Sequence, residues 1–210
     1  RLIQAMQDIL TQRYNAPYAY GFAGVRQFHL GARLGFYRQL QPLWANYHTP
    51  AQVSSRFSAL WAARKIDWDV ARLDKIWHRR AAQLTHPSVS RTAAYLGWRY
   101  RDHPTNTYQL WVLSFLAVDR GWFVTRTMPN GHICIVDALL PASVAPAKFI
   151  ATLLAALVKH NVELPPVYSW LGQSGTPAEG DPVIASEVKI KHWHTQYSSP
   201  AFQPGDTDVF

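Results

Sequence analysis

The sequence predicts an all-α fold, mostly a compact multi-helix domain, with one small hairpin near residues 122–136 and an irregular C-terminal tail. Apolar residues recur at the 3.6-residue helical spacing in residues 54–83 and again in residues 147–161. A chain of 210 residues with 48% hydrophobic content can bury roughly 70% of its unfolded surface. We therefore expect one helical domain over residues 1–196 and a poorly ordered or docked tail over residues 197–210.

The central feature is a pair of helices predicted within residues 54–83. Asp67 or Asp69 can cap the second helix, because a short carboxylate accepts hydrogen bonds from the free N–H groups of a first turn. The apolar stripes of the two helices place these residues in the core: Val53, Phe57, Leu60, Trp61, Val70, Leu73, Ile76 and Trp77.

Four further helices are predicted before residue 121. Residues 1–12 form an amphipathic helix, and residues 25–41 form an imperfect one that contains two glycines and ends near Pro42. Residues 89–101 form a third helix. A fourth helix is predicted from the run that begins at Asn106, which is apolar nearly all round and stops at Gly121, and we expect it to be the most buried helix of the domain.

The C-terminal half contains the only predicted strands. Two apolar segments flank Met128-Pro129-Asn130-Gly131, which is a hairpin signal. A clear helix follows over residues 147–161, and a short helix is predicted over residues 183–193. The sequence from residue 197 onward has no periodicity.

The positive charge is concentrated in the first half of the chain. Residues 1–103 contain 15 Lys and Arg against 5 Asp and Glu, whereas the rest contains 6 against 8. Such asymmetry favours an acidic partner, namely nucleic acid, anionic lipid or an acidic protein segment, or else a merely solvated basic surface. The predicted binding surface consists of Arg64, Arg72, Lys75, Arg79 and Arg80, with Arg26, Arg33 and Arg38 as second candidates.

No local motif for catalysis or metal binding is present. The sequence has no HxxxH pair on a predicted helix, and no CxxC, GxSxG, phosphate-binding loop or GxGxxG motif. Only Asp119 and Asp137 are acidic residues in apolar settings. We therefore predict no catalytic residue, no metal and no cofactor, although an unrecognised hydrolase stays open as a third alternative.

The single cysteine and the hydropathy indicate the compartment. Cys134 lies among apolar residues, so it is expected to be buried and inert, and one cysteine fits a reducing environment. No apolar run reaches 18 residues, and no signal peptide is present. Because the chain begins at Arg1, we expect an upstream part that could include membrane helices.

Four short sequence segments resemble segments of the DotM/IcmP–TrbA family, whose members belong to the coupling complexes of type IVB secretion and conjugation systems. They are residues 39–44 (QLQPLW), 58–64 (SALWAAR), 112–117 (VLSFLA) and 162–171 (VELPPVYSWL). The sequence departs from the family at Ala138–Ala142 and at Pro129–Gly131, which indicates a divergent, plasmid-type member.

The resemblance implies a non-enzymatic adaptor at the cytoplasmic face of the bacterial inner membrane, anchored upstream of this chain. Its implied partners are the coupling ATPase, other secretion or conjugation subunits, and the Glu-rich signals of transported proteins. Such contacts would be weak and sensitive to salt, because each exposed Arg–carboxylate pair contributes only about 0–1 kcal/mol. The alternative is a helical domain that binds DNA during conjugative transfer, although no recognition helix or RNA-binding motif is evident.

Overall fold

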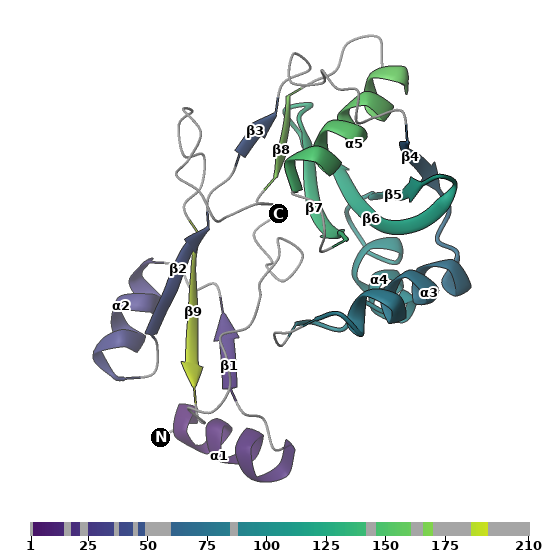
Figure 1. Ribbon diagram of the computed structural model, residues 1–210. Coiled ribbons are helices and arrows are strands. Elements are labelled where there is room, and N and C mark those ends of the chain that lie inside the picture. The colour runs from purple at the N-terminus through teal and green to yellow at the C-terminus, as the bar shows by residue number, and fades with distance from the viewer. Residues whose placement is uncertain are drawn as a thin grey trace.

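The computed structural model describes residues 2–14, 18–21, 25–35, 38–43, 46–48, 60–84, 88–141, 146–160, 166–169 and 186–192. Its main layer is a six-stranded sheet in the order β3-β8-β7-β6-β5-β4. Helices cover both faces of this sheet (Figure 1). The fold is therefore α/β, and the prediction of an all-α fold is wrong.

Four consecutive antiparallel strands form most of the sheet, with β4 at its edge. They are β4 (Trp61–Ile66), β5 (Gln109–Phe115), β6 (Val118–Thr127) and β7 (Ile133–Leu139). The β5–β6 turn places Leu116 and Ala117 at φ 47° and 63°. Two adjacent residues with positive φ match the right-handed twist of the flanking strands, although non-glycine residues rarely adopt this conformation.

Helices pack against the two faces of this sheet and divide the core into two parts. On one face lie α3 (Val70–Ala81), α4 (Ala93–Leu96) and the π-helical turn η3 (Gly97–Arg101). On the other face lies α5 (Pro146–His160). Figure 1 shows the sheet between α5 and the α3–α4 pair. Trp122 packs with the α3–α4 side, whereas Phe123, the next residue, packs with α5.

One strand of the sheet is parallel to its neighbour. β8 (Val167–Ser169) runs parallel to β7, and α5 lies between them in the chain, so β7, α5 and β8 form a βαβ unit. β3 (Asn46–His48) pairs with β8 at the sheet edge.

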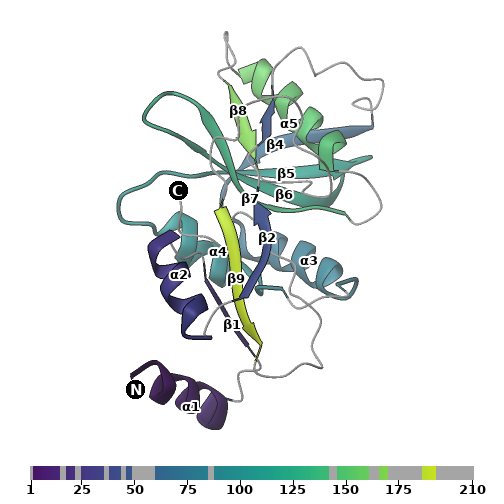
Figure 2. The same ribbon diagram turned by 90° about the vertical axis from the view of Figure 1, so that its left-hand side faces the viewer.

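A second, three-stranded sheet is built from segments far apart in sequence. β9 (Ser186–His192) lies between β1 (Tyr18–Gly21) and β2 (Arg38–Leu43), antiparallel to both (Figure 2). The helix α1 (Leu2–Tyr14) precedes β1 in the chain, and α2 (Val25–Arg33) lies between β1 and β2. In the described ranges, no helix is long and apolar enough to cross a membrane.

Several predicted elements are confirmed. α1, α3, α5 and the hairpin around Gly131 lie where the sequence placed them, and Asp69 caps α3 by accepting a hydrogen bond from the Arg72 amide at 3.0 Å. The predicted helix over residues 89–101 is confirmed in part, as α4 and η3. The predicted helix over residues 25–41 is also confirmed in part, because α2 ends at Arg33 and β2 follows.

Three predicted helices are wrong. Residues 61–66 form β4, the predicted helix that ends at Gly121 is instead β5 and the start of β6, and residues 186–192 form β9. Residues 110–114 are buried because both faces of the sheet are covered, and a strand buried on both faces has an apolar run like that of a buried helix. The predicted tail over residues 197–210 lies outside the described residues.

Candidate functional site

The site that we call the fork lies at the carboxyl ends of the parallel strands β7 and β8. They pair at only three positions, the last of which joins Ile135 to Ser169. β7 continues to Leu139, and within the described residues β8 gives Val136–Leu139 no partner. Ligands of α/β proteins bind outside the carboxyl ends of parallel strands, at a point where the order of the strands changes direction. The fork is therefore the candidate functional site.

A β-bulge lies directly at the fork. Val124 of β6 pairs with Asp137 and Thr125 pairs with Ile135, so Val136 is an extra residue in β7. A bulge breaks the alternation of side chains and re-aims the residue that follows it. As a result Val136 and Asp137 both face the α3–α4 side, where Val136 joins the apolar core and Asp137 meets Tyr100.

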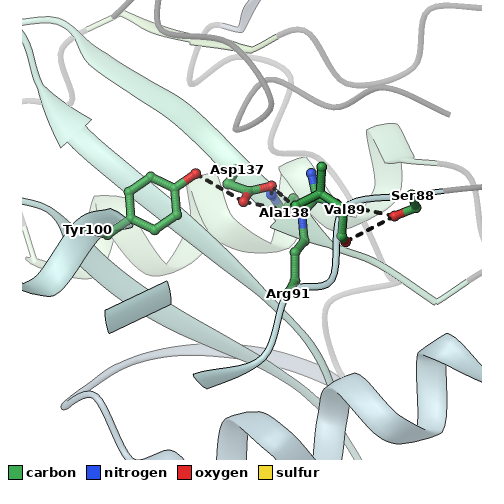
Figure 3. Close-up of polar contacts among 6 residues, drawn as sticks. All are labelled: Ser88, Val89, Arg91, Tyr100, Asp137 and Ala138. Atoms are coloured by element: carbon green, nitrogen blue, oxygen red, sulfur yellow. Dashed lines mark hydrogen bonds and ion pairs between the residues drawn. The ribbon is translucent and has the colours of Figure 1, made fainter. Parts of the chain in front are cut away.

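Asp137 is held by a buried polar network (Figure 3). Arg91 Nε lies 3.0 Å from Asp137 Oδ1, and neither side chain is exposed to solvent. The Tyr100 hydroxyl donates to Oδ2 at 3.0 Å, and the Ala138 amide donates to Oδ1 at 2.8 Å. Burial and the charge of Asp137 raise the pKa of Tyr100 well above its ordinary value, so the phenol remains a donor. This network fixes the backbone on the carboxyl side of the bulge.

The N-terminus of α5 follows the carboxyl end of β7. A helix N-terminus carries partial positive charge and attracts anions. The first turn of α5 contains no acidic residue and carries the exposed Lys148, which adds a full positive charge. The connecting sequence Leu140–Pro146 contains two prolines and no glycine, unlike glycine-rich phosphate loops.

The predicted basic residues of α3 converge on Asp119 and on the end of β7. Arg72 donates to the Asp119 carboxylate through Nε at 2.6 Å and Nη2 at 3.0 Å. Arg79 Nη1 donates to the Asp119 backbone carbonyl at 2.7 Å, and Arg80 Nε donates to the Leu140 carbonyl at 2.9 Å. Lys75 is exposed on the same helix.

Asp119 therefore neutralises one of these cations. Burial raises the pKa of Asp119, but the hydrogen bonds from Arg72 and Ser114 and the charges of Arg72 and Arg64 outweigh that effect. The net result is a pKa below the ordinary value of an aspartate. Asp119 is thus an ionised structural partner of α3 at neutral pH.

The remaining predicted basic residues lie elsewhere. Arg64 lines a cavity of about 280 Å³ at the β4 edge, together with Trp61 and Ser114. Arg26 and Arg33 lie on α2, and Arg38 begins β2. Figure 1 shows α2 well separated from α3, so the eight candidates do not form one surface.

Sequence patterns missed most of the site residues. Val136, Arg91 and Lys148 carry no motif, and only Asp137 stood out, as a carboxylate within an apolar run. A second signal was available in principle, because an apolar strand followed by an amphipathic helix and another short strand is typical of a βαβ unit. Across the described ranges, no group of three or more His, Cys, Asp or Glu residues could hold a metal ion.

The architecture is that of the GCN5-related N-acetyltransferase fold. This chain is similar to a GCN5-related N-acetyltransferase from Anabaena variabilis (TM-score 0.61, 12% identity), with 90% of this chain and 48% of that chain covered. It is also similar to a conserved protein from Enterococcus faecalis described as a probable N-acyltransferase (TM-score 0.62, 11% identity), with 90% and 48% covered. A third similar structure is a tandem GNAT protein from the clavulanic acid biosynthesis pathway, solved without AcCoA (TM-score 0.50, 11% identity), with 91% and 69% covered.

The chain spans about half the length of the first two of these proteins. No protein-family model matches the sequence, and no curated protein matches it. At these identities the likeness establishes the fold.

This likeness corrects the resemblance to the DotM/IcmP–TrbA family. Residues 38–43 and 61–66 are strands, so the sequence segments that resemble the family do not form the helices that the family would imply. The expectation of a non-enzymatic secretion or conjugation adaptor is overturned, because the proteins that share the fold are described as an N-acetyltransferase and as a probable N-acyltransferase. The DNA-binding alternative is not supported either.

Proposed function

We propose that this chain is the catalytic domain of an acyltransferase that transfers an acyl group from a coenzyme A thioester, such as acetyl-CoA, to an amine. The observation that carries the proposal is the fork between β7 and β8, with its bulge at Val136. The names of the proteins that share this fold give the reaction class.

The free edge of β7 fits the donor's extended arm. Pantetheine is a narrow chain with two amide groups, and such a chain can add to an exposed strand edge as a further strand would. Val136–Leu139 would supply that edge, because they have no partner in β8 within the described residues. An acyl thioester supplies an activated carbonyl carbon, from which the sulfur leaves when an amine takes the acyl group.

The chain's own backbone supports this chemistry. Amide N–H groups that are held rigidly beside a carbonyl oxygen stabilise the negative charge that develops there during acyl transfer. The Arg91–Asp137–Tyr100 network holds the peptide groups on the carboxyl side of the bulge in one conformation. Rigid donors need no reorganisation during the reaction, which is the source of their catalytic effect.

The N-terminus of α5 would hold the donor's phosphates. Lys148 and the helix dipole both favour negative charge at this point. Proline has no N–H, and residues with a Cβ limit the approach of a ligand to the backbone, so the segment Leu140–Pro146 offers a weaker cradle than a glycine-rich loop. The donor affinity therefore depends on Lys148 more than on backbone contacts.

The direct test is a thiol-release assay with acetyl-CoA and a mixture of primary amines, combined with calorimetric titration of CoA. We expect amine-dependent thiol release and saturable CoA binding. Lys148→Glu should weaken CoA binding by roughly fivefold or more, because it reverses a charge at a helix N-terminus. Lys65→Glu, an equivalent exposed change on β4, is the matched control. Absence of both CoA binding and thiol release would contradict the proposal.

A further inference from the structure

A cavity of about 280 Å³ lies where the start of β4 meets the turn between β5 and β6. Its walls are mostly apolar, and they include Leu60, Ala62, Leu116 and Ala117. The Leu116 amide donates a hydrogen bond to the Leu60 carbonyl at 3.0 Å, so the backbone ties two sides of the cavity together. The volume is just below the lower limit of about 300 Å³ that is usual for ligand pockets, so the cavity suits a small ligand.

The turn that borders the cavity has a backbone conformation that its residues do not favour. Leu116 and Ala117 have φ values of 47° and 63°, where glycine and asparagine are the usual residues. The Leu116 side chain is 63% exposed and that of Leu60 is 53% exposed, so burial in the protein core does not offset this strain. A ligand that covers the two leucines would offset it, and backbone strain of this kind gathers at binding sites.

One cation borders the cavity without a paired carboxylate in the part of the chain that the structure describes. Arg64 lines the cavity, is exposed, and takes part in none of the ion pairs there. The charge of Arg64 helps to lower the pKa of Asp119, but both oxygens of that carboxylate already accept hydrogen bonds from Arg72. The guanidinium of Arg64 is therefore available to an anion that enters the cavity.

The cavity is separate from the fork. The strand registers align four residues in one row across the sheet, namely Leu139 of β7, Trp122 of β6, Val112 of β5 and Arg64 of β4. Neighbouring strands lie about 4.8 Å apart, so Arg64 and the end of β7 are roughly 14 Å apart along the sheet. A small ligand in the cavity would thus leave the proposed acyl-donor site open.

We propose that this cavity binds a short aliphatic monocarboxylate, whose hydrocarbon chain covers Leu60 and Leu116 and whose carboxylate pairs with Arg64. A single guanidinium matches one planar carboxylate through two parallel hydrogen bonds. The apolar walls disfavour an anion with several charges, because its further charges would lose water without gaining partners. The inference goes beyond the proposed acyl transfer and does not depend on it.

The first experiment follows the amide chemical shifts of the labelled protein during titration with butanoate, hexanoate and octanoate, without CoA. We expect saturable shifts at residues 60–64 and 114–117, with dissociation constants in about the millimolar range. Each added methylene should tighten binding about threefold to fourfold until the cavity is full. Hexanol and hexylamine should bind about fivefold more weakly than hexanoate, because neither is an anion.

Three variants assign the two parts of the ligand. Arg64→Gln should remove the preference for hexanoate over hexanol. Lys65→Gln, which removes the neighbouring exposed charge of β4, is the matched control and should keep that preference. Ala62→Phe should block binding at every chain length, because the larger side chain fills the cavity. Thermal melts of each variant verify folding.

The turn provides a test that a purely structural role would fail. The double variant Leu116→Asn/Ala117→Gly should raise the melting temperature, because asparagine and glycine accept a positive φ. It should also weaken hexanoate binding about fivefold or more, because the leucine side chain that covers the ligand is lost. A lower melting temperature with unchanged hexanoate affinity would show that Leu116 serves the fold and not a binding site.

Two further results would overturn the inference. One is the absence of saturable shifts at residues 60–64 and 114–117 at hexanoate concentrations up to about 50 mM. The other is equal affinity for hexanoate and hexanol, which would leave Arg64 without a role in the cavity. Either result leaves the proposed acyl transfer intact, because that function is tested separately by CoA binding and thiol release.

Discussion

The guanidinium of Arg91 and the carboxylate of Asp137 form an ion pair in which neither side chain is exposed to solvent. Asp137 directly follows the bulged Val136, so the pair lies just beyond Ile135, the last residue of β7 that pairs with the described part of β8. Burying two charges is costly unless further hydrogen bonds satisfy them, and here Tyr100 and the Ala138 amide do so. The ion pair therefore holds the backbone directly after the bulge.

Removing one member of this pair should destabilise the fold strongly. We expect Arg91→Ala to lower the free energy of unfolding by about 3–5 kcal/mol, because it leaves a carboxylate buried without its partner. Urea denaturation followed by tryptophan fluorescence measures the change. The exposed Arg101–Asp102 pair provides the control, since Arg101→Ala should have little effect. The double variant Arg91→Met/Asp137→Leu should recover much of the loss, and a loss equal to that of Arg91→Ala would contradict this account.

Tyr100 should limit stability at high pH. Its pKa in the folded protein is raised by burial and by the charge of Asp137, whereas in the unfolded chain a tyrosine ionises near pH 10. The stabilisation is present below that pH and is lost as the pH rises above it. We expect the wild-type protein to lose stability relative to Tyr100→Phe above about pH 10. A constant difference between the two proteins from pH 7 to pH 11 would exclude this effect.

Asp119 should contribute stability that disappears in acid. Its pKa is lowered in the folded protein, so the stabilisation is present above the ordinary aspartate pKa near 3.9 and is lost as the pH falls through the folded value. Asp119→Asn should cost about 1–2 kcal/mol at pH 7 and much less near pH 2. Urea titrations at both pH values test the difference. Equal costs at the two pH values would show that the charge of Asp119 is not what holds Arg72.

Replacement of Gly121 or of Gly131 by alanine should destabilise the fold, for a different physical reason at each position. A Cβ at Gly121 would lie 2.2 Å from the Leu139 carbonyl oxygen, so Gly121→Ala should force β6 and β7 apart and cost about 1–3 kcal/mol or more. A Cβ at Gly131 meets nothing, but its φ of +82° is unfavourable for alanine and should cost about 1–2 kcal/mol. Only Gly121→Ala should also weaken CoA binding, since only Gly121 contacts the end of β7. Calorimetry of both variants measures this contrast.

The sequence predicted the helices better than the strands. α3 has a clear amphipathic stripe and an Asp69 cap, so local signals defined it. β5 is buried on both faces, and the turn at Leu116-Ala117 that joins it to β6 contains neither glycine nor asparagine, so no local signal separated β5 and the start of β6 from a helix.

The site was harder to predict because it depends on tertiary structure. The fork depends on the pairing of β7 with β8 at three positions, and the residues that hold β7 there, Arg91 and Asp137, are 46 positions apart. The cluster of cations on α3 was visible in the sequence. Its relation to Asp119 and to the end of β7 was not.

The most direct test of the central claim is an amide chemical-shift titration of the labelled protein with acetyl-CoA. The account predicts saturable shifts that are largest at Val136–Leu139 and in the first turn of α5. The exposed amides of β4 at the far edge of the sheet serve as an internal control. Absence of saturable shifts, or shifts confined to β4 or to the small β1-β9-β2 sheet, would contradict the assignment of the fork as the acyl-donor site.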